Sequence, residues 1–278
     1  MLAFSRSRRR LSEPSPALDR RAVRRRFERA AKSYLDASRL EAEVGARMLA
    51  RLDYVKLEPR RILDAGSGPP QRALAKRYPR AEVIALDFAL AMLRPRGFRF
   101  FRKARAVCAD MERLPLADGV IDLMWCNMAL HWVVDPRAAF ADFARVLAPQ
   151  GLLMFSTLGP DTLKELRAAV GAERVHAFVD MHDLGDMLVA AGFSAPVMDM
   201  EMVSLEYRAE RSLLTDLRAS GQTSARADRA RGLAPRSLRE RLRALPARAS
   251  FEVVYGHAWS PRKANQSAKT IRVFKRMP

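Results

Sequence analysis

A glycine-containing loop between an apolar run and a helix is the stretch of this chain whose residue types point most directly to chemistry. Residues 64–68 read D-A-G-S-G and follow the apolar residues 61–63. Gly66 and Gly68 lack a Cβ, so the backbone can approach a ligand closely, although a tight turn alone would also explain them. A strand, a glycine turn and a helix form the first unit of a nucleotide-binding α/β sheet. Two prolines follow the loop, so neither the dinucleotide fingerprint nor a Walker loop is present.

A carboxylate at the end of the next apolar run is the second candidate group. Residues 82–87 read E-V-I-A-L-D and end at Asp87, about 20 residues beyond the glycines. A carboxylate in this place can accept hydrogen bonds from both hydroxyls of a ribose. It can also cap the helix expected at residues 89–93, and its two oxygens make the roles compatible. The pair of signals predicts a nucleoside-bearing ligand.

The D-x-G-x-G form of the loop resembles motif I of the class I S-adenosylmethionine methyltransferases, and other segments extend the resemblance. Residues 109–115 (A-D-M-E-R-L-P) resemble the segment whose aspartate binds the adenine amino group and whose next residue packs on the ring. A simpler interpretation makes that aspartate a helix N-cap. Residues 121–127 (I-D-L-M-W-C-N) resemble motif IV. The resemblance implies S-adenosylmethionine as cofactor, bound by Asp64, Ala65, Gly66, Gly68, Asp87, Phe88, Met92, Asp110, Met111 and Asn127.

Three further side chains are candidates for the acceptor substrate. Residues 26–34 (R-F-E-R-A-A-K-S-Y) resemble the family's first helix, which covers the cofactor and brings Tyr34 to the active site. The alternative is a tyrosine packed in the core. His131 and Trp132 follow the fourth apolar strand and are expected to face the substrate crevice, with Trp132 contacting the substrate. Tyr34 and His131 are the catalytic candidates, and His131 is expected to orient rather than to act as a strong base.

Apolar runs define the elements that must hold these groups. They predict a strand that ends at residues 61–63 and strands at residues 82–87, 104–109, 120–127, 152–157, 197–207 and 251–259. Nearly continuous apolar strands are typical of a parallel sheet covered on both faces. The order predicts an α/β, class I methyltransferase (Rossmann-like) fold, with a seven-stranded, mostly parallel sheet, helices on both faces and a reversed last strand.

The domain organisation follows from changes in composition. Residues 1–20 are expected to be a disordered basic tail, although they also resemble a mitochondrial transit peptide. Residues 21–260 are expected to form a single methyltransferase domain. Within it, the arginine-dense residues 208–248 predict a helical insertion before the last strand. Residues 261–278 are expected to be a basic C-terminal tail.

Composition limits the partners and the compartment. The net charge is +19, which suits nucleic acid or an acidic protein, but no nucleic-acid motif is present and an acidic partner is expected. No run approaches the roughly 20 apolar residues of a membrane span. Cys108 and Cys126 are expected to be reduced core residues, and the histidines lack metal-ligand spacing, so no metal is predicted. A cytoplasmic location in a bacterium is expected.

Three segments outside the cofactor motifs resemble the malonyl-acyl-carrier-protein O-methyltransferases of biotin synthesis. They are residues 155–167 (F-S-T-L-G-P-D-T-L-K-E-L-R), 181–186 (M-H-D-L-G-D) and 255–259 (Y-G-H-A-W). The resemblance implies methyl transfer from S-adenosylmethionine to the free carboxylate of a malonyl thioester, carried by acyl carrier protein or coenzyme A. The products would be the methyl ester and S-adenosylhomocysteine. A carboxylate is already ionised, so alignment and desolvation suffice without a strong base.

Two alternatives stay open on the sequence. The D-T-L-x-E-L-R and D-L-G phrases also resemble a methyltransferase-like assembly factor of mitochondrial complex I, thought to hydroxylate arginine on a partner subunit. That interpretation would make the chain mitochondrial. The other alternative is a non-catalytic binding protein on the same fold, which Pro69 and Pro70 favour because the family usually has a glycine at the second of these positions.

Overall fold

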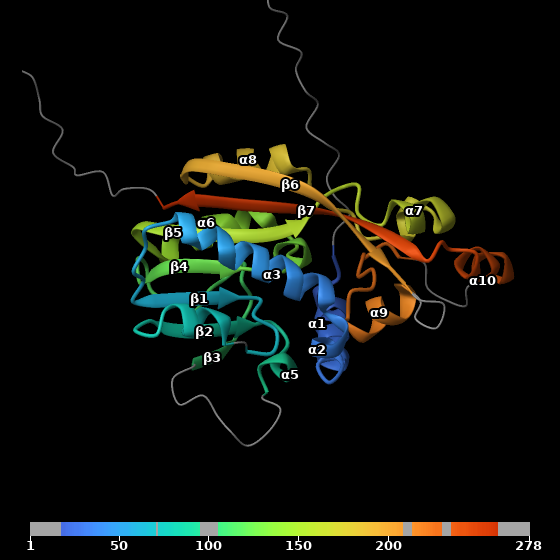
Figure 1. Ribbon diagram of the computed structural model, residues 1–278, viewed down its shortest axis with the longest axis horizontal. Helices are drawn as coiled ribbons and strands as arrows, with labels where there is room; N and C mark the ends of the chain where they lie inside the picture. Colours follow the sequence, from blue (N-terminus) through green and yellow to red (C-terminus); the bar gives the residue numbers. More distant parts are fainter. Residues whose placement is uncertain (1–17, 71, 95–104, 208–212, 230–234, 261–278) are drawn as a thin grey trace, which may run out of the picture.

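A single seven-stranded sheet forms the centre of the molecule (Figure 1). The computed structural model describes residues 18–70, 72–94, 105–207, 213–229 and 235–260. The strand order is β3-β2-β1-β4-β5-β7-β6. The strands are β1 (Arg61–Ala65), β2 (Glu82–Asp87), β3 (Arg105–Cys108), β4 (Ile121–Cys126), β5 (Leu147–Leu158), β6 (Ser194–Glu206) and β7 (Arg248–Trp259).

Strand direction confirms the predicted fold class. β1 to β5 pair in parallel, whereas β7 runs antiparallel to both β5 and β6. The order reverses at the β1–β4 pair, because one half of the sheet winds towards β3 and the other towards β5. In open α/β sheets, ligands bind beyond the carboxyl ends of the strands at such a switch point. The predicted glycine loop follows β1 and therefore lies there.

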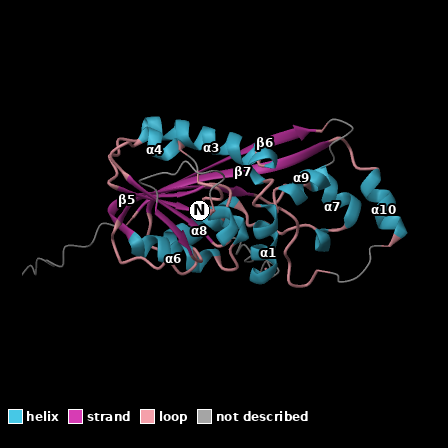
Figure 2. Cartoon of the chain, turned by 90° about the horizontal axis from the view of Figure 1, so that it is seen from below, coloured by secondary structure: helices cyan, strands magenta, loops and turns pink. Residues whose placement is uncertain are grey.

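Helices cover both faces of the sheet, as predicted. Figure 2 shows α3 and α4 along one face and α6 and α8 along the other. The helices are α1 (Arg20–Ala30), α2 (Tyr34–Ala37), α3 (Arg39–Arg51), α4 (Ala73–Arg77), α5 (Leu90–Leu93), α6 (Pro136–Val146), α7 (Lys164–Val170), α8 (Met181–Ala190), α9 (Leu213–Ala219) and α10 (Arg236–Arg243), with short 3-10 turns at Leu52–Tyr54, Leu130–Trp132 and Ala172–Arg174. Within the described residues, no helix is long and apolar enough to span a bilayer.

The two faces of the sheet build two separate hydrophobic cores. Along β4, Leu123 and Trp125 pack with α3 on one side, whereas Met124 and Cys126 pack with α6 and α8 on the other. This alternation follows from the period of two along a strand. Both sides are buried, which explains why the strand reads as a continuous apolar run.

Three local predictions need correction. The expected single helix reaching Tyr34 ends at Ala30, because the Ser33 hydroxyl donates to the carbonyls of Ala30 (3.2 Å) and Ala219 (2.7 Å) and competes with the helical pattern. Cys108 is exposed and not in the core, since β3 is an edge strand, while Cys126 is buried as expected. β5 begins at Leu147 and not at the predicted residue 152, because Leu147 already pairs with Ile121 of β4.

The helical insertion joins the amino-terminal segment rather than standing apart. α9 contacts α2, and α10 contacts α7 beside β7. The Asp19 amide donates to the Ala225 carbonyl (2.9 Å), and Arg26 Nη1 donates to the Thr223 carbonyl (2.9 Å). The first helix and the insertion therefore form one continuous cover. The predicted tails lie almost entirely outside the described residues, and the domain boundaries stay predictions.

Candidate active site

The carboxyl ends of β1, β2 and β4 surround a cavity of about 70 Å³ that α1 closes from above. Its lining brings together most of the residues that the sequence singled out. They are Tyr34, Gly66, Gly68, Asp87, Phe88, Met92, Asp110, Met111 and Trp132. Segments far apart in the chain therefore meet where the sequence predicted the cofactor.

The glycine loop needs its glycines for both conformation and space. Gly66 and Gly68 have φ of 73° and 58°, in the region that side chains rarely adopt. A Cβ on Gly66 would lie 2.3 Å from the Cβ of Ala129, and one on Gly68 would lie 3.4 Å from the Tyr34 ring. The amide of Gly66 also donates to the Leu86 carbonyl at 2.8 Å. The loop is thus a tight turn fastened to β2, and its inner side borders the cavity.

Asp87 fastens the glycine loop to the following helix. One carboxylate oxygen accepts from the Gly68 amide (2.9 Å) and the other from the Ala89 amide (2.8 Å). Burial raises the pKa of Asp87 to about 6, partly offset by these two hydrogen bonds, while Glu28 adds to the rise. The predicted N-cap role is wrong, because the N-cap residue of α5 is Ala89 and no side chain caps that helix; Asp87 instead holds the turn before it. Each oxygen retains a second acceptor position, and the ribose role stays a prediction.

A second cavity, of about 240 Å³, adjoins the first beneath α3 and shares Tyr34 and Gly66 with it. Asp64 and Asn127 line this cavity rather than the first, and Ala65 is buried in the sheet beneath the loop. Asn127 is held in place, because its Nδ2 donates to the Glu41 carbonyl (2.9 Å) and its Oδ1 accepts from Ser156 (2.9 Å).

Two carboxyl groups, the half-buried Asp64 and the buried Glu41, give this second cavity its electrostatic character. Burial raises the pKa of Asp64 to about 7, and the charge of Asp87 adds to the rise. Burial likewise raises the pKa of Glu41, on α3, to about 7. A cation placed beside such groups would restore their ionised form. The cavity therefore suits a positively charged ligand group, and nothing in the sequence motifs marked Glu41 for this place.

Asp110 caps the turn that follows β3 and also faces the covering helix. Its Oδ1 accepts from the Glu112 amide (2.9 Å), and its Oδ2 lies 3.2 Å from Arg20 Nη1. Arg20 also pairs with Glu112, whose other oxygen accepts from the Val134 amide (2.6 Å). The N-cap interpretation is wrong, because no helix follows Asp110 in the described segment between β3 and β4, and the contact with adenine stays a prediction.

Helix α1 makes further contacts across the cavity. The Arg24 guanidinium carbon lies 5.8 Å from the centre of the Phe88 ring. Glu28 accepts from the Ala91 amide at 3.2 Å. With Arg20, these contacts join α1 to the loops after β2 and β3. The helix therefore lies over the cavity as a lid, which the sequence predicted from residues 26–34, although it did not identify Arg20 or Arg24.

Tyr34 lies against the glycine loop, and Trp132 forms the opposite part of the wall. The Tyr34 ring contacts Gly68 and lies 6.5 Å from Phe27, and burial raises its pKa well above the usual value. Trp132 meets Phe27 edge to face at 5.3 Å. The aromatic side chains thus enclose the cavity between them.

His131 does not line the cofactor cavity. It lies behind Trp132 in a neighbouring cavity of about 200 Å³, together with His176. Its Nδ1 is 3.3 Å from Thr157 Oγ1. Burial and the neighbouring His176 hold the pKa of His131 well below its usual range, so the ring is neutral. This position favours orientation over acid–base chemistry at the cofactor.

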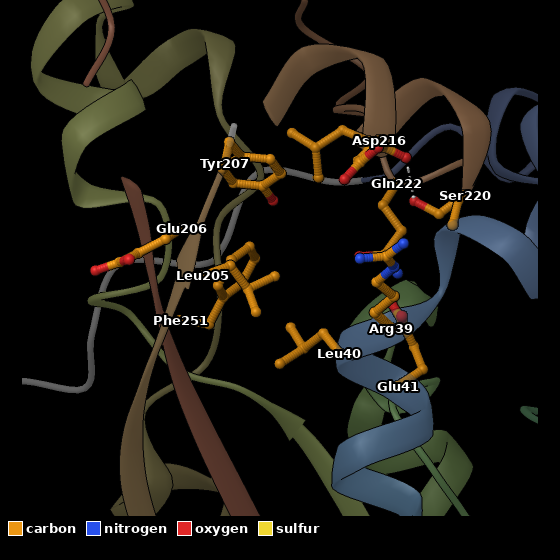
Figure 3. Close-up of a pocket in the computed structure, with 12 residues that line it drawn as sticks. Arg39, Leu40, Glu41, Leu205, Glu206, Tyr207, Asp216, Ser220, Gln222 and Phe251 are labelled. Carbon is orange, nitrogen blue, oxygen red and sulfur yellow. Dashed lines mark hydrogen bonds between the residues drawn. The ribbon is translucent and has the colours of Figure 1, made fainter. Parts of the chain in front are cut away.

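A larger cavity, of about 530 Å³, lies at the amino-terminal end of α3 (Figure 3). Figure 3 shows Arg39, Leu40 and Glu41 of α3 on one side of it. Leu205 and Phe251 stand on the other side. Three residues (Leu217, Gln222 and Phe251) line both this cavity and the one at His131. Among the residues described, no cluster of histidine, cysteine or carboxylate side chains is arranged to hold a metal ion.

Comparison with known proteins identifies the family. A family model described as "Methyltransferase domain" matches residues 63–155. The malonyl-[acyl-carrier protein] O-methyltransferase of Methylovorus sp. (strain MP688) is 48% identical, over 88% of this chain and 90% of that protein. The protein of the same name from Laribacter hongkongensis (strain HLHK9) is also 48% identical, over 87% of this chain and 90% of its own length.

The chain belongs to the malonyl-[acyl-carrier protein] O-methyltransferase family. The fold agrees. The crystal structure of YcgJ from Bacillus subtilis matches with a TM-score of 0.56 and 16% identity, covering 78% of this chain and 99% of that one.

Members of this methyltransferase family use S-adenosylmethionine as methyl donor, and the cavities fit that cofactor. A nucleoside would occupy the cavity between α1 and the glycine loop. A cationic end would lie beside Asp64. Burial disfavours the ionised form of this carboxyl group, and a neighbouring cation would stabilise that form. The assignment of individual residues to parts of the cofactor stays a prediction.

Proposed function

We propose that this enzyme transfers the methyl group of S-adenosylmethionine to the free carboxylate of a malonyl group carried by an acyl carrier protein. The observation that carries the proposal is the 48% identity, over 88% of the chain, to a protein of that name. The product is a methyl ester, which masks the charge so that fatty-acid enzymes can elongate it in biotin synthesis. The arginine-modifying and non-catalytic alternatives have no comparable support.

The side chains described here suit a reaction that needs alignment more than base catalysis. The bound cofactor supplies an electrophilic methyl group, and the malonyl carboxylate is already ionised near neutral pH. Tyr34 and Trp132 exclude water from the cavity, and a closed, oriented site supplies much of the rate of such a reaction. The neutral His131 lies one side chain behind Trp132, which supports an orienting role.

The acyl carrier protein is proposed as partner in preference to coenzyme A, because the relatives' names specify the carrier protein. The net charge of +19 supports an acidic protein partner as well. A cytoplasmic location is proposed with it, since that is where a bacterial acyl carrier protein is found.

Mass spectrometry of malonyl-acyl carrier protein tests the proposal directly. After incubation with the enzyme and S-adenosylmethionine, the carrier should gain one CH₂ unit, and S-adenosylhomocysteine should appear in equal amount. Acetyl-acyl carrier protein lacks a free carboxylate and should stay unchanged. Methylation of both carriers, or of neither while the cofactor still binds, would reject a carboxylate acceptor.

A further inference from the structure

The cavity of about 200 Å³ beside the cofactor site has apolar walls and a polar inner end. Leu166 of α7, Leu214 of α9 and Leu242 of α10 contribute to its walls, and His131 and His176 stand at the inner end. Trp132 lines both this cavity and the cofactor cavity. A molecule that enters here therefore reaches the cofactor by passing one aromatic side chain.

Hydrogen bonding defines the chemistry of the inner end. His176 Nε2 lies 2.7 Å from the main-chain carbonyl oxygen of His131. A carbonyl oxygen only accepts, so Nε2 carries the hydrogen, and in a neutral ring Nδ1 is then an acceptor. Burial lowers the pKa of His176 to about 4, so the ring is neutral near pH 7. Among the residues described, this buried Nδ1 has no hydrogen-bond partner, and neither has His131 Nε2.

Charge distinguishes this cavity from the larger one in Figure 3. The larger cavity is lined by Glu41, Glu206 and Asp216 against a single arginine, Arg39. The cavity at His176 has Arg174 in its lining and no carboxylate. The malonyl carboxylate is anionic, so the cavity at His176 suits it better than the larger cavity does.

The structure assigns this cavity, on the basis of the proposed function, to the amide-bearing thioester arm of the carrier protein. His176 Nδ1 accepts a hydrogen bond from the amide N–H nearest the thioester, while the apolar walls contact the methylene groups. The malonyl carboxylate then points past Trp132 towards the cofactor. His176 is thus a positioning residue, which contacts the thioester arm and not the carboxylate that is methylated.

A pair of small substrates tests the contact. Malonyl-N-acetylcysteamine thioester has an amide at the required place, and the malonyl n-pentyl thioester has the same chain length without it. The wild-type enzyme should use the first with a kcat/KM about three- to tenfold higher, the range expected of one neutral hydrogen bond. In His176→Phe, which keeps a ring against Trp132 and Phe178 (both 4.9 Å from His176), the ratio should fall to near one.

The ratio of the two kcat/KM values is informative even if the variant loses part of its activity, because a general defect of the enzyme lowers the turnover of both substrates. An unchanged preference in His176→Phe overturns the contact. Turnover of neither thioester and of no malonyl-carrier protein by the wild-type enzyme, with S-adenosylmethionine still bound, overturns the proposed function instead.

Two matched substitutions test which cavity holds the arm. Leu242→Trp fills the cavity at His176, and Leu205→Trp fills the larger cavity; both leucines are half-buried. Leu242→Trp should raise KM for malonyl-carrier protein about tenfold, while Leu205→Trp changes it less than about twofold. The affinity for S-adenosylmethionine should stay unchanged in both. The reverse order of effects would assign the arm to the larger cavity.

Discussion

Single carboxyl groups carry much of the electrostatic character of this site. Glu41 is buried and Asp64 and Asp87 are half-buried beside the cofactor cavities, and desolvation raises the pKa of each. Asp87 also holds two backbone amides. Hydrogen bonds within the chain therefore fix the geometry of the site. The carboxyl groups are partly protonated until a cationic ligand binds beside them.

Replacing Asp87 by alanine should weaken S-adenosylmethionine binding by roughly 1.5–3 kcal/mol, the range for hydrogen bonds to a charged group. The variant also loses the acceptors for Gly68 and Ala89, so the melting temperature must be measured beside the calorimetric affinity. A folded variant with wild-type affinity would mean that Asp87 only holds the amides of Gly68 and Ala89.

Cofactor binding should strengthen as pH rises through the raised pKa of Asp64, about 7. Below that value the folded protein holds this carboxyl protonated, and a cationic ligand must expel the proton. Binding should therefore release protons, and calorimetry in buffers of different ionisation enthalpy measures how many. Asp64→Asn cannot release one, so proton release as large as in the wild type would refute the assignment.

The same group has the opposite effect on the stability of the ligand-free protein. Because the folded pKa lies above the unfolded value, the folded state binds more protons between the two. The contribution of Asp64 to the free energy of unfolding therefore decreases as pH rises from about 4 to about 7. Bound S-adenosylmethionine should reduce this decrease.

At the scale of elements, α1 is the helix that covers the cavity predicted to hold the cofactor. Asp110→Ala removes the carboxylate predicted to bind adenine and should weaken cofactor binding by roughly 1.5–3 kcal/mol. Arg20→Ala removes the ion pairs that join α1 to Asp110 and Glu112. Because the Arg20 side chain is 50% exposed, the loss in the free energy of cofactor binding should be at most about 1 kcal/mol. Stopped-flow measurement of cofactor release compares the two, and equal losses would mean that Asp110 acts only through Arg20.

Elements with local signals could be predicted from the sequence, and contacts between distant segments could not. The strands, the glycine loop and the carboxylate of Asp87 show in runs of a few residues, and the fold class follows from their order. Arg20 pairs with Glu112 across 92 residues, and His176 meets His131 across 45. Nothing near these residues in the chain marks them, because they meet only when α1 and the segment after α7 pack against the loops that follow the strands.

At the scale of the whole molecule, the net charge of +19 is partly displayed on α10. Leu238 is buried against the cavity at His176, while Arg236, Arg239 and Arg243 are exposed. An acidic carrier protein that docks on α10 would place its thioester arm beside the cavity at His176. The helix thus combines a charged outer side with an apolar inner one.

Changing Arg236, Arg239 and Arg243 together to glutamate should raise KM for malonyl-acyl carrier protein at least about tenfold at low salt. Turnover of malonyl-N-acetylcysteamine thioester, which has no carrier protein, should change little. Added salt should weaken the wild-type reaction with the carrier and affect the variant less. Equal losses on both substrates would indicate a folding defect and not a docking surface.

The hydrogen bonds that join α1 to the insertion have a consequence for the order of events in turnover. Asp19 and Arg26 hydrogen-bond to residues 223–225, so we expect a carrier protein bound to the insertion to hold the lid closed. S-adenosylmethionine must then bind first, and S-adenosylhomocysteine must leave last. Steady-state kinetics should show S-adenosylhomocysteine competing with S-adenosylmethionine but not with the carrier substrate. The enzyme would work by a compulsory sequence, in which the carrier protein itself keeps the spent cofactor from escaping early.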